Sequence, residues 1–314
     1  MCDIDKERNK IVNCLCCKHC LPPNKRINGE LCSLKINNKN NIMEIFTHLI
    51  ITRFMCQDFI SDNANVNFNS PEWIEMSFDM ASRHIIPTLE NQTNKDFTLV
   101  FLVGNNTTPE IAQKIYHLSN IINIMVVRYN EFDVYIQSIP SDYLITSRLD
   151  YDDHVYNECV EDIHKLLDEK PDIKLWGLNQ GVSIVDGEDQ AYLMRREKFE
   201  QDKEGFFAPM ETLILKKTAC NRNKYFDIYK LGYHTEVIRN FLNTQRIRMK
   251  RDDYELKDIY ATTNERNIDY IWIRHNNSAS ALAFNIIHTT NVKVELSYEE
   301  LVKRFGYDFI PMPK

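Results

Sequence analysis

The stretch Tyr143–Asp153 limits the folds open to this chain more than any other, because a short apolar run leads there directly into a group of carboxylates. Residues 143–146 read Tyr-Leu-Ile-Thr, a composition typical of a buried strand. Asp150, Asp152 and Asp153 follow shortly after it. Crowded carboxylates are costly unless a cation neutralises them, and Mg²⁺ or Mn²⁺ suits oxygen ligands. The pattern predicts a divalent-metal site at the end of a strand, with a solvated acidic turn as the alternative.

Apolar runs alternate with amphipathic stretches around this motif. Strands are predicted at residues 45–52, 97–103, 124–127 and 143–147. Helices are predicted after Ser70-Pro71, after Thr108-Pro109, and at residues 131–138 and 157–170. This order predicts an α/β fold, related to the Rossmann fold, whose mostly parallel central sheet is flanked by helices. Ligands of such sheets bind beyond the carboxyl ends of strands, which is where the aspartates fall.

The second half of the chain has a different pattern. Further strands are predicted at residues 173–185, 190–194, 206–216 and 270–275, and a closing helix at 298–305. The chain has only eight glycines, and neither G-x-G-x-x-G nor G-x-x-x-x-G-K-[ST] occurs. A bound phosphate would therefore need a metal rather than a glycine loop. The net charge of −7 argues against a protein that binds nucleic acid electrostatically.

Cysteines concentrate at the N-terminus, where five of the nine lie within the first 20 residues. Residues 1–42, with linker-like Pro and Asn stretches, are predicted to form an appendage to a main domain at 43–314. The spacing of Cys14, Cys17, Cys20 and Cys32, with His19 nearby, makes a small zinc site one interpretation. A flexible tail with free thiols is the other.

The first residues, Met1 to Arg8, lack the apolar core of a signal peptide, and no apolar run approaches the length needed to span a membrane. We therefore expect a cytoplasmic protein without a transmembrane segment.

Several pieces of the chain together resemble one class of enzymes. The pieces are His48 with Arg53-Phe54, Pro71-Glu72-Trp73, Thr108-Pro109-Glu110, and above all Thr146-Ser147-Arg148-Leu149-Asp150-Tyr151-Asp152-Asp153. Arg274-His275-Asn276-Asn277 is similar to a C-terminal His-Gly-x-Asn motif, with Asn276 in place of the glycine. In this order they resemble GT-A glycosyltransferases, and more narrowly a family described as rhamnosyltransferases. The resemblance covers about residues 45–285 and leaves the N-terminal segment outside.

The resemblance implies a metal-dependent transfer of a sugar, with rhamnose as one candidate, from a dTDP- or UDP-sugar to a glycan or another hydroxyl acceptor. By this resemblance Asp152, Asp150 and His275 hold Mn²⁺ or Mg²⁺, and His234 is a weaker candidate. The same resemblance makes Arg53, Arg148, Asp150 and Asp153 the nucleotide-sugar-binding residues. For Arg148, an ion pair with the aspartates is the alternative.

An inverting transfer needs a general base for the acceptor hydroxyl. Glu211 is the first candidate, because it lies in an apolar run, and Asp189 and Asp186 on a predicted turn are alternatives. A surface position on a strand is the other interpretation of Glu211. A competing hypothesis is a non-catalytic binding module that uses the Cys-rich segment and the basic run at 246–251.

Overall fold

The computed structural model describes residues 34–37, 43–55, 70–170, 173–185, 191–195, 209–216, 227–231, 237, 240–241, 243, 260–263, 268–274, 293–294 and 298–306. Asp186, Asp189, His234, His275, the basic run at 246–251 and the four candidate zinc cysteines therefore lie outside the described residues.

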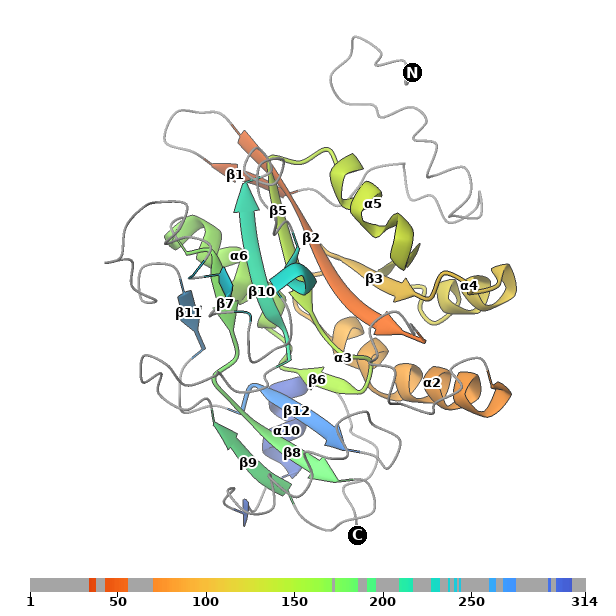
Figure 1. Ribbon diagram of the computed structural model, residues 1–314. Coiled ribbons are helices and arrows are strands. Elements are labelled where there is room, and N and C mark those ends of the chain that lie inside the picture. Colours follow the sequence, from red (N-terminus) through yellow and green to blue (C-terminus); the bar gives the residue numbers. More distant parts are fainter. Residues whose placement is uncertain are drawn as a thin grey trace, which may run out of the picture.

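Among the described residues, the larger of two sheets has eight strands (Figure 1), and the two largest clusters of buried hydrophobic residues lie on its faces. Its order is β11-β7-β10-β5-β2-β3-β4, and β1 also pairs with β2. The strands are β1 (Leu34–Asn37), β2 (Met43–Phe54), β3 (Thr98–Val103), β4 (Asn123–Arg128), β5 (Tyr143–Arg148), β7 (Leu175–Gly177), β10 (Glu211–Lys216) and β11 (Tyr260–Thr262). The run β4-β3-β2-β5 is parallel, as is the pair β7-β11, whereas β10 is antiparallel to both of its neighbours. The expectation of an α/β fold with a mostly parallel central sheet is confirmed.

A second sheet of five strands, in the order β13-β9-β8-β12-β6, was not predicted as a separate layer. Its strands are β6 (Asp153–Val155), β8 (Gln180–Val185), β9 (Ala191–Arg195), β12 (Tyr270–Arg274) and β13 (Lys293–Val294). The chain passes directly from β5 in the large sheet to β6 in this one, through residues 149–152. The acidic motif thus lies at one of the places where the chain crosses between the two sheets (Figure 1).

Helices cover both faces of the large sheet. They are α2 (Pro71–Arg83), α3 (Ile85–Glu90), α4 (Pro109–Tyr116), α5 (Phe132–Ser138) and α6 (Cys159–Glu169), with 3₁₀ turns η3 (Tyr129–Glu131) and η4 (Ile228–Leu231). In contrast, α10 (Tyr298–Phe305) packs on the second sheet, where Phe305 clusters with Val182 and Ile271. The two predicted N-caps are confirmed, because the hydroxyls of Ser70 and Thr108 accept from the backbone N–H groups of Trp73 and Ile111.

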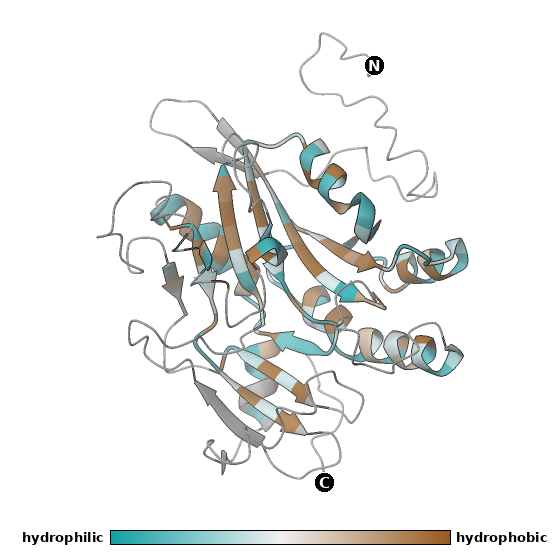
Figure 2. Ribbon diagram, in the orientation of Figure 1, coloured by the Kyte–Doolittle hydropathy of each residue, from teal (hydrophilic) through white to brown (hydrophobic). Residues whose placement is uncertain are grey.

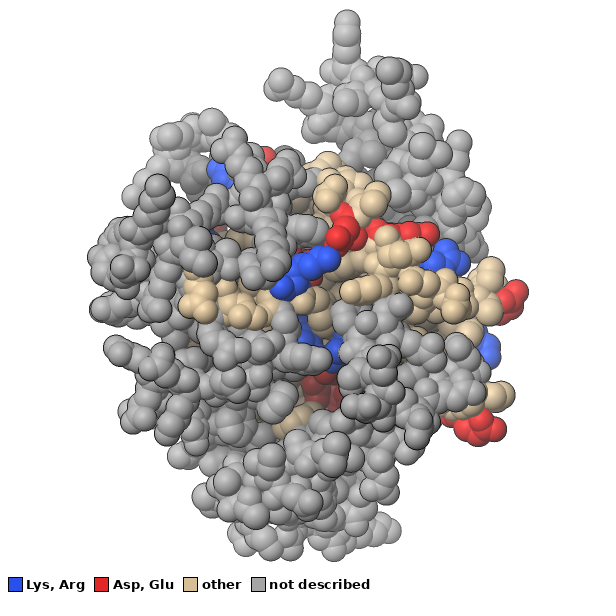
Figure 3. Space-filling view, in the orientation of Figure 1, with Lys and Arg blue, Asp and Glu red and all other residues tan. Residues whose placement is uncertain are grey.

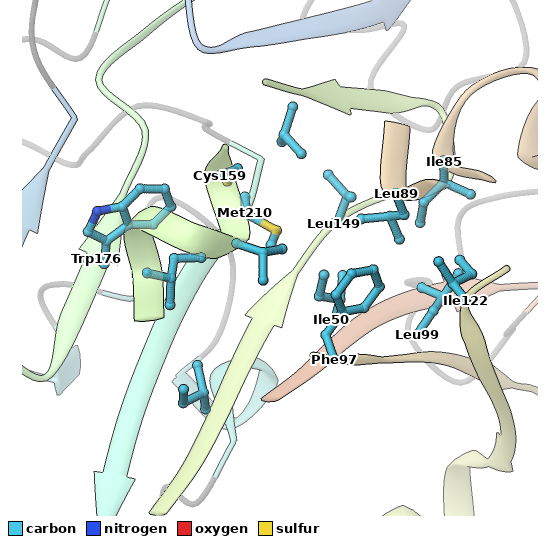
Figure 4. Close-up of a cluster of buried hydrophobic side chains, with 14 of the residues drawn as sticks. Ile50, Ile85, Leu89, Phe97, Leu99, Ile122, Leu149, Cys159, Trp176 and Met210 are labelled. Atoms are coloured by element: carbon cyan, nitrogen blue, oxygen red, sulfur yellow. The ribbon is translucent and has the colours of Figure 1, made fainter. Parts of the chain in front are cut away.

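Strand alternation divides the core into two layers. Ile50, Leu99 and Ile145 face the layer that contains α3 and α6, whereas Leu49, Val100 and Leu144 face the layer that contains α5 and η4. Figure 4 shows part of the first layer, with Ile85 and Leu89 of α3 beside the strands. Figure 2 shows the matching pattern, apolar along the strands and hydrophilic on the outer sides of helices. Burial on both faces explains why β3 is apolar at every position after Thr98.

Most element boundaries differ from the expectation by a few residues, and four differences are larger. The helix after Ser70 breaks at His84, and the run 173–185 divides between β7 and β8, which lie in different sheets. β10 begins at Glu211, since Met210 has a left-handed backbone (φ 61°) that a strand does not adopt. Residues 34–37 lie within the predicted appendage, yet they form β1 and pair with β2.

Candidate functional site

Two arginines lie at the carboxyl ends of neighbouring parallel strands. Arg53 is the penultimate residue of β2, Arg148 is the last residue of β5, and the pairing of Ile51 with Arg148 brings the two strand ends together. Alternation places both arginines on the face of the sheet that carries α5 and η4. The carboxylate of Asp150 lies between them, with Oδ1 3.5 Å from Arg53 Nη2 and 3.9 Å from Arg148 Nε. Two predicted nucleotide-binding residues and one predicted metal ligand are thus brought together.

The guanidinium of Arg148 is buried, with 3 % of the residue exposed. It lies against the ring of Tyr229, whose centroid is 4.8 Å from Arg148 Cζ and 5.7 Å from Arg53 Cζ. Burial lowers the pKa of Arg148, and the charge of Asp150 partly restores it. Among the described residues, Arg148 Nε has no hydrogen-bond partner. A buried N–H group without a hydrogen-bond partner costs free energy. This group can therefore still donate a hydrogen bond to an acceptor atom of a ligand.

Glu211 lies directly opposite Arg148 in the antiparallel pairing of β10 with β5. Only 2 % of the residue is exposed, which rules out the alternative of a glutamate on the strand surface. Its carboxylate raises the pKa of Arg148, so the two side chains interact electrostatically. The sequence could not show this contact, because it depends on the insertion of β10 between β5 and β7.

The three aspartates of the motif take separate positions. Asp150 is paired with the arginines, whereas Asp153 is the first residue of β6, is 4 % exposed, and lies opposite Trp272 of β12. Asp152 lies near the Tyr151 phenol, whose pKa rises through burial first and through the charge of Asp152 second. Within the described part of the chain, no three His, Cys, Asp or Glu side chains are grouped so that they could hold a metal ion.

Two residues of η4 and its cap belong to this region and were missed in the sequence. The carboxyl Oδ1 of Asp227 accepts the backbone N–H groups of Tyr229 (2.9 Å) and Lys230 (3.2 Å), which fixes the turn. The Tyr229 hydroxyl donates to the carbonyl of Ile51 in β2 (3.2 Å). Burial raises the pKa of Asp227 to about 6, against the opposing charge of Lys230. An Asp two residues before a Tyr is no recognisable motif, so no sequence signal marks this pair.

Charges of opposite sign lie beside one another on the surface of this face. Figure 3 shows blue and red side chains adjacent to each other near the middle of the view. One exposed pair of this kind is Lys230 with Asp133 of α5, at 3.0 Å. In this view the described Lys and Arg side chains lie beside Asp and Glu side chains rather than forming one basic patch.

Within the described residues, no helix has both the length and the apolar composition needed to cross a bilayer.

Solved structures with a distant similarity to this chain include two of TarS and one of HddC. Residues 1–349 of TarS from S. aureus align with 73% of this chain at 11% identity and a TM-score of 0.40. A longer TarS structure gives 12% identity over 73% of this chain with a TM-score of 0.36, and HddC from Yersinia pseudotuberculosis gives 9% over 83% with 0.34. The chain spans 60% and 36% of the two TarS structures and 98% of HddC. No family model and no curated protein matches the chain.

Proposed function

We propose that this protein is a glycosyltransferase that takes its sugar from a nucleoside-diphosphate donor, with the diphosphate held by Arg53 and Arg148. The observation that carries the proposal is the buried Arg148 Nε–H, which has no hydrogen-bond partner among the described residues. An arginine–phosphate hydrogen bond is charge-assisted and would satisfy this group. The position also fits, because ligands of such sheets bind beyond the carboxyl ends of the parallel strands.

A divalent metal is part of the proposal. Mg²⁺ is commonly held by one or two carboxylates together with substrate phosphates and water, so a group of three protein ligands is not needed. Asp150 and Asp152 suit this role, because both are partly exposed where the chain crosses between β5 and β6. Asp153 and His275 stay predictions as further ligands of the donor or the metal. When bound, the metal would supply a positive charge that stabilises the departing diphosphate.

The reaction we propose is an inverting transfer. The oxygen of an acceptor hydroxyl forms a bond to the anomeric carbon, and the bond from that carbon to the diphosphate oxygen breaks. The electron pair leaves with the diphosphate, where Arg53 and Arg148 stabilise the new charge. Glu211 stays our first candidate for the base that receives the hydroxyl proton, because its buried carboxyl group lies directly opposite Arg148 in the register of β10 with β5. Asp189 and Asp186 stay the alternatives.

The first experiment measures the binding of uridine diphosphate and thymidine diphosphate by calorimetry. Arg148→Met and Arg53→Met should each weaken binding by about 10- to 100-fold, the effect of losing one hydrogen bond between charged groups. Arg128→Met is the matched control, because Arg128 is a partly exposed arginine that pairs with Glu131 rather than with Asp150. Arg53→Met keeps the test valid if the buried Arg148 variant does not fold. Unchanged affinity in both site variants would contradict the proposal.

A second experiment concerns the metal. Asp152→Asn should abolish any gain in diphosphate affinity on adding Mn²⁺, since it removes a charged ligand while keeping the shape of the side chain. Equal affinity with and without Mn²⁺ in the unaltered protein would refute metal dependence. Screening dTDP- and UDP-sugars, dTDP-rhamnose included, by the Mn²⁺-dependent shift of the melting temperature would then identify the donor.

A third experiment tests the base. Glu211→Gln should lower sugar transfer by the ~10²- to 10⁴-fold typical of general-base loss, with little change in donor binding. Asp189→Asn, measured in parallel, decides between the two candidates. Full activity in both variants would show that the base lies elsewhere or that transfer retains configuration.

A further inference from the structure

A line of hydrogen bonds crosses the core on the opposite side of the large sheet from the arginines. Asn94 Nδ2 lies 3.0 Å from His164 Nδ1, and His164 Nε2 lies 3.0 Å from His48 Nδ1. His48 Nε2 in turn lies 2.8 Å from Ser147 Oγ of β5. His48 and Ser147 are 1 % and 0 % exposed, so these groups form hydrogen bonds with each other rather than with water.

The two ends of this line set the direction of its bonds. The amide nitrogen of Asn94 can only donate, and the orientation of the amide is fixed because its Oδ1 accepts from the N–H of Asp96 (2.8 Å). At the other end, the hydroxyl of Thr212 in β10 donates to the carbonyl of Met210 (2.9 Å), which can only accept. Every group between these ends must therefore accept from one neighbour and donate to the next.

Only one arrangement of protons satisfies that condition. His164 and His48 are both neutral and both carry their proton on Nε2, and the Ser147 hydroxyl donates to the Thr212 hydroxyl at 2.6 Å. The pKa shifts agree with neutral rings, because burial lowers the pKa of His164 to about 4. Burial, and then the nearby His164, lower the pKa of His48 well below its usual range.

The line ends beside the proposed binding site. Ser147 and Thr212 are register partners of β5 and β10, and the adjacent pair in that register is Arg148 with Glu211. Met210, whose carbonyl accepts the last bond, has a left-handed backbone, which is unfavourable for a residue other than glycine. Its N–H donates to the carbonyl of Arg148 at 2.6 Å. Such a conformation persists where its surroundings hold it, and here the hydrogen bonds do so.

We propose that His48 and His164 are positioning residues of the site. Their hydrogen bonds to Ser147, and through it to Thr212, hold the ends of β5 and β10 together on the face of the sheet opposite the arginines; we call this arrangement the clamp. The clamp fixes the direction in which Arg148 and Glu211 face their ligand. The identity of that ligand rests on the proposed function, whereas the clamp itself does not.

The arrangement of protons is tested by the ¹⁵N resonances of the histidine rings in the full chain at pH 7. Both His48 and His164 should be neutral, with Nε2 protonated and Nδ1 unprotonated. His48→Gln and His164→Gln assign the two signals. Either ring in the Nδ1–H form, or either ring charged at pH 7, would overturn the directional line.

The positioning role is tested by Thr212→Val, which keeps the side-chain shape and removes the hydroxyl. Thr88→Val is the matched control, because Thr88 is a fully buried threonine of α3 whose hydroxyl bonds to the backbone of Val155. The Arg148 Nε–H resonance should shift in Thr212→Val, return in Thr212→Ser, and stay unchanged in Thr88→Val. A loss of stability alone would be similar in the two valine variants and would leave this resonance in place.

Ligand binding supplies the second readout. The affinity for uridine diphosphate with Mn²⁺ should fall on the order of tenfold in Thr212→Val, as is usual for groups that orient a binding residue, and should recover in Thr212→Ser. An unshifted Arg148 resonance together with unchanged affinity would overturn the inference. If the unaltered protein binds no nucleoside diphosphate, the proposed function fails, whereas the histidine and Arg148 resonances still decide whether the clamp exists.

Discussion

Burial gives single residues of this site unusual properties. Arg148 and Asp227 are both buried on the face of the large sheet that carries η4, the first with a lowered pKa and the second with a raised one. Tyr229 connects them, since its ring lies against Arg148 and its N–H bonds to Asp227. A buried carboxyl with a raised pKa makes the free energy of unfolding depend on pH, and this dependence can be measured without knowing the substrate.

We predict that stability falls as pH rises through the range from about 4 to about 6, where Asp227 is protonated in the folded chain and ionised in the unfolded one. The shift from 3.8 to about 6 corresponds to roughly 3 kcal/mol. Asp227→Asn keeps the Oδ1 acceptor for η4 and removes the titration, so its advantage over the unaltered protein should grow with pH. Denaturant unfolding at pH 4 and pH 7 measures both proteins.

The control for that prediction is Asp168→Asn, on the exposed side of α6. It removes one carboxyl group outside η4 and so controls for the change in net charge. The interpretation of Asp227 fails if Asp227→Asn keeps the same difference in stability between the two pH values.

At the scale of elements, the second sheet depends on a close approach between β8 and β12. A Cβ atom on Gly181 would lie 2.4 Å from Cδ2 of the Tyr270 ring, which real contacts do not allow. Tyr270 is 1 % exposed and the two residues are register partners, so the ring has little room to move. Glycine is required at this position for space rather than for backbone freedom.

Gly181→Ala should therefore destabilise the protein by about 1–3 kcal/mol, the usual cost of overpacking a core. Tyr270→Leu alone should also destabilise, because it leaves a cavity. The double variant should be more stable than the sum of the single losses predicts, since the shorter side chain makes room for the new methyl group. Strictly additive losses in denaturant unfolding would show that the ring and the glycine do not interact.

For the whole molecule, the open question is where the main domain begins. β1 lies inside the predicted appendage, yet its four residues pair with Met43–Phe46 at the start of β2. The division at residue 42 stays a prediction, but a cut at that point removes a strand of the large sheet.

We predict that deleting residues 1–33 leaves the melting temperature nearly unchanged, whereas deleting residues 1–42 lowers stability by about 1 kcal/mol or more, because β1 and its hydrogen bonds are lost. Thermal unfolding of the two shortened chains and the full chain measures this. Equal melting of all three would show that β1 adds nothing, and loss of cooperative unfolding on deleting 1–33 would contradict an appendage. Metal analysis before and after that deletion tests the zinc interpretation of Cys14, Cys17, Cys20 and Cys32.

Local patterns in the sequence account for much of the architecture. The apolar run at 97–103 and the caps at Ser70 and Thr108 each depend on a few consecutive residues, so they can be recognised without the fold. The alternation of strands and helices then limits the sheet to a mostly parallel one. The same reasoning placed Arg53, Arg148 and Asp150 at strand ends, where the structure brings them together.

Other features depend on pairing between distant segments, which no local pattern encodes. The register of β10 against β5 sets Glu211 opposite Arg148, and the approach of η4 brings Tyr229 to the guanidinium. The chain between β7 and β8 passes from one sheet to the other, although its sequence reads as one continuous run. Contacts of this kind are stabilised by the burial of both partners, and that burial exists only in the folded core. The tertiary structure therefore determines which side chains meet.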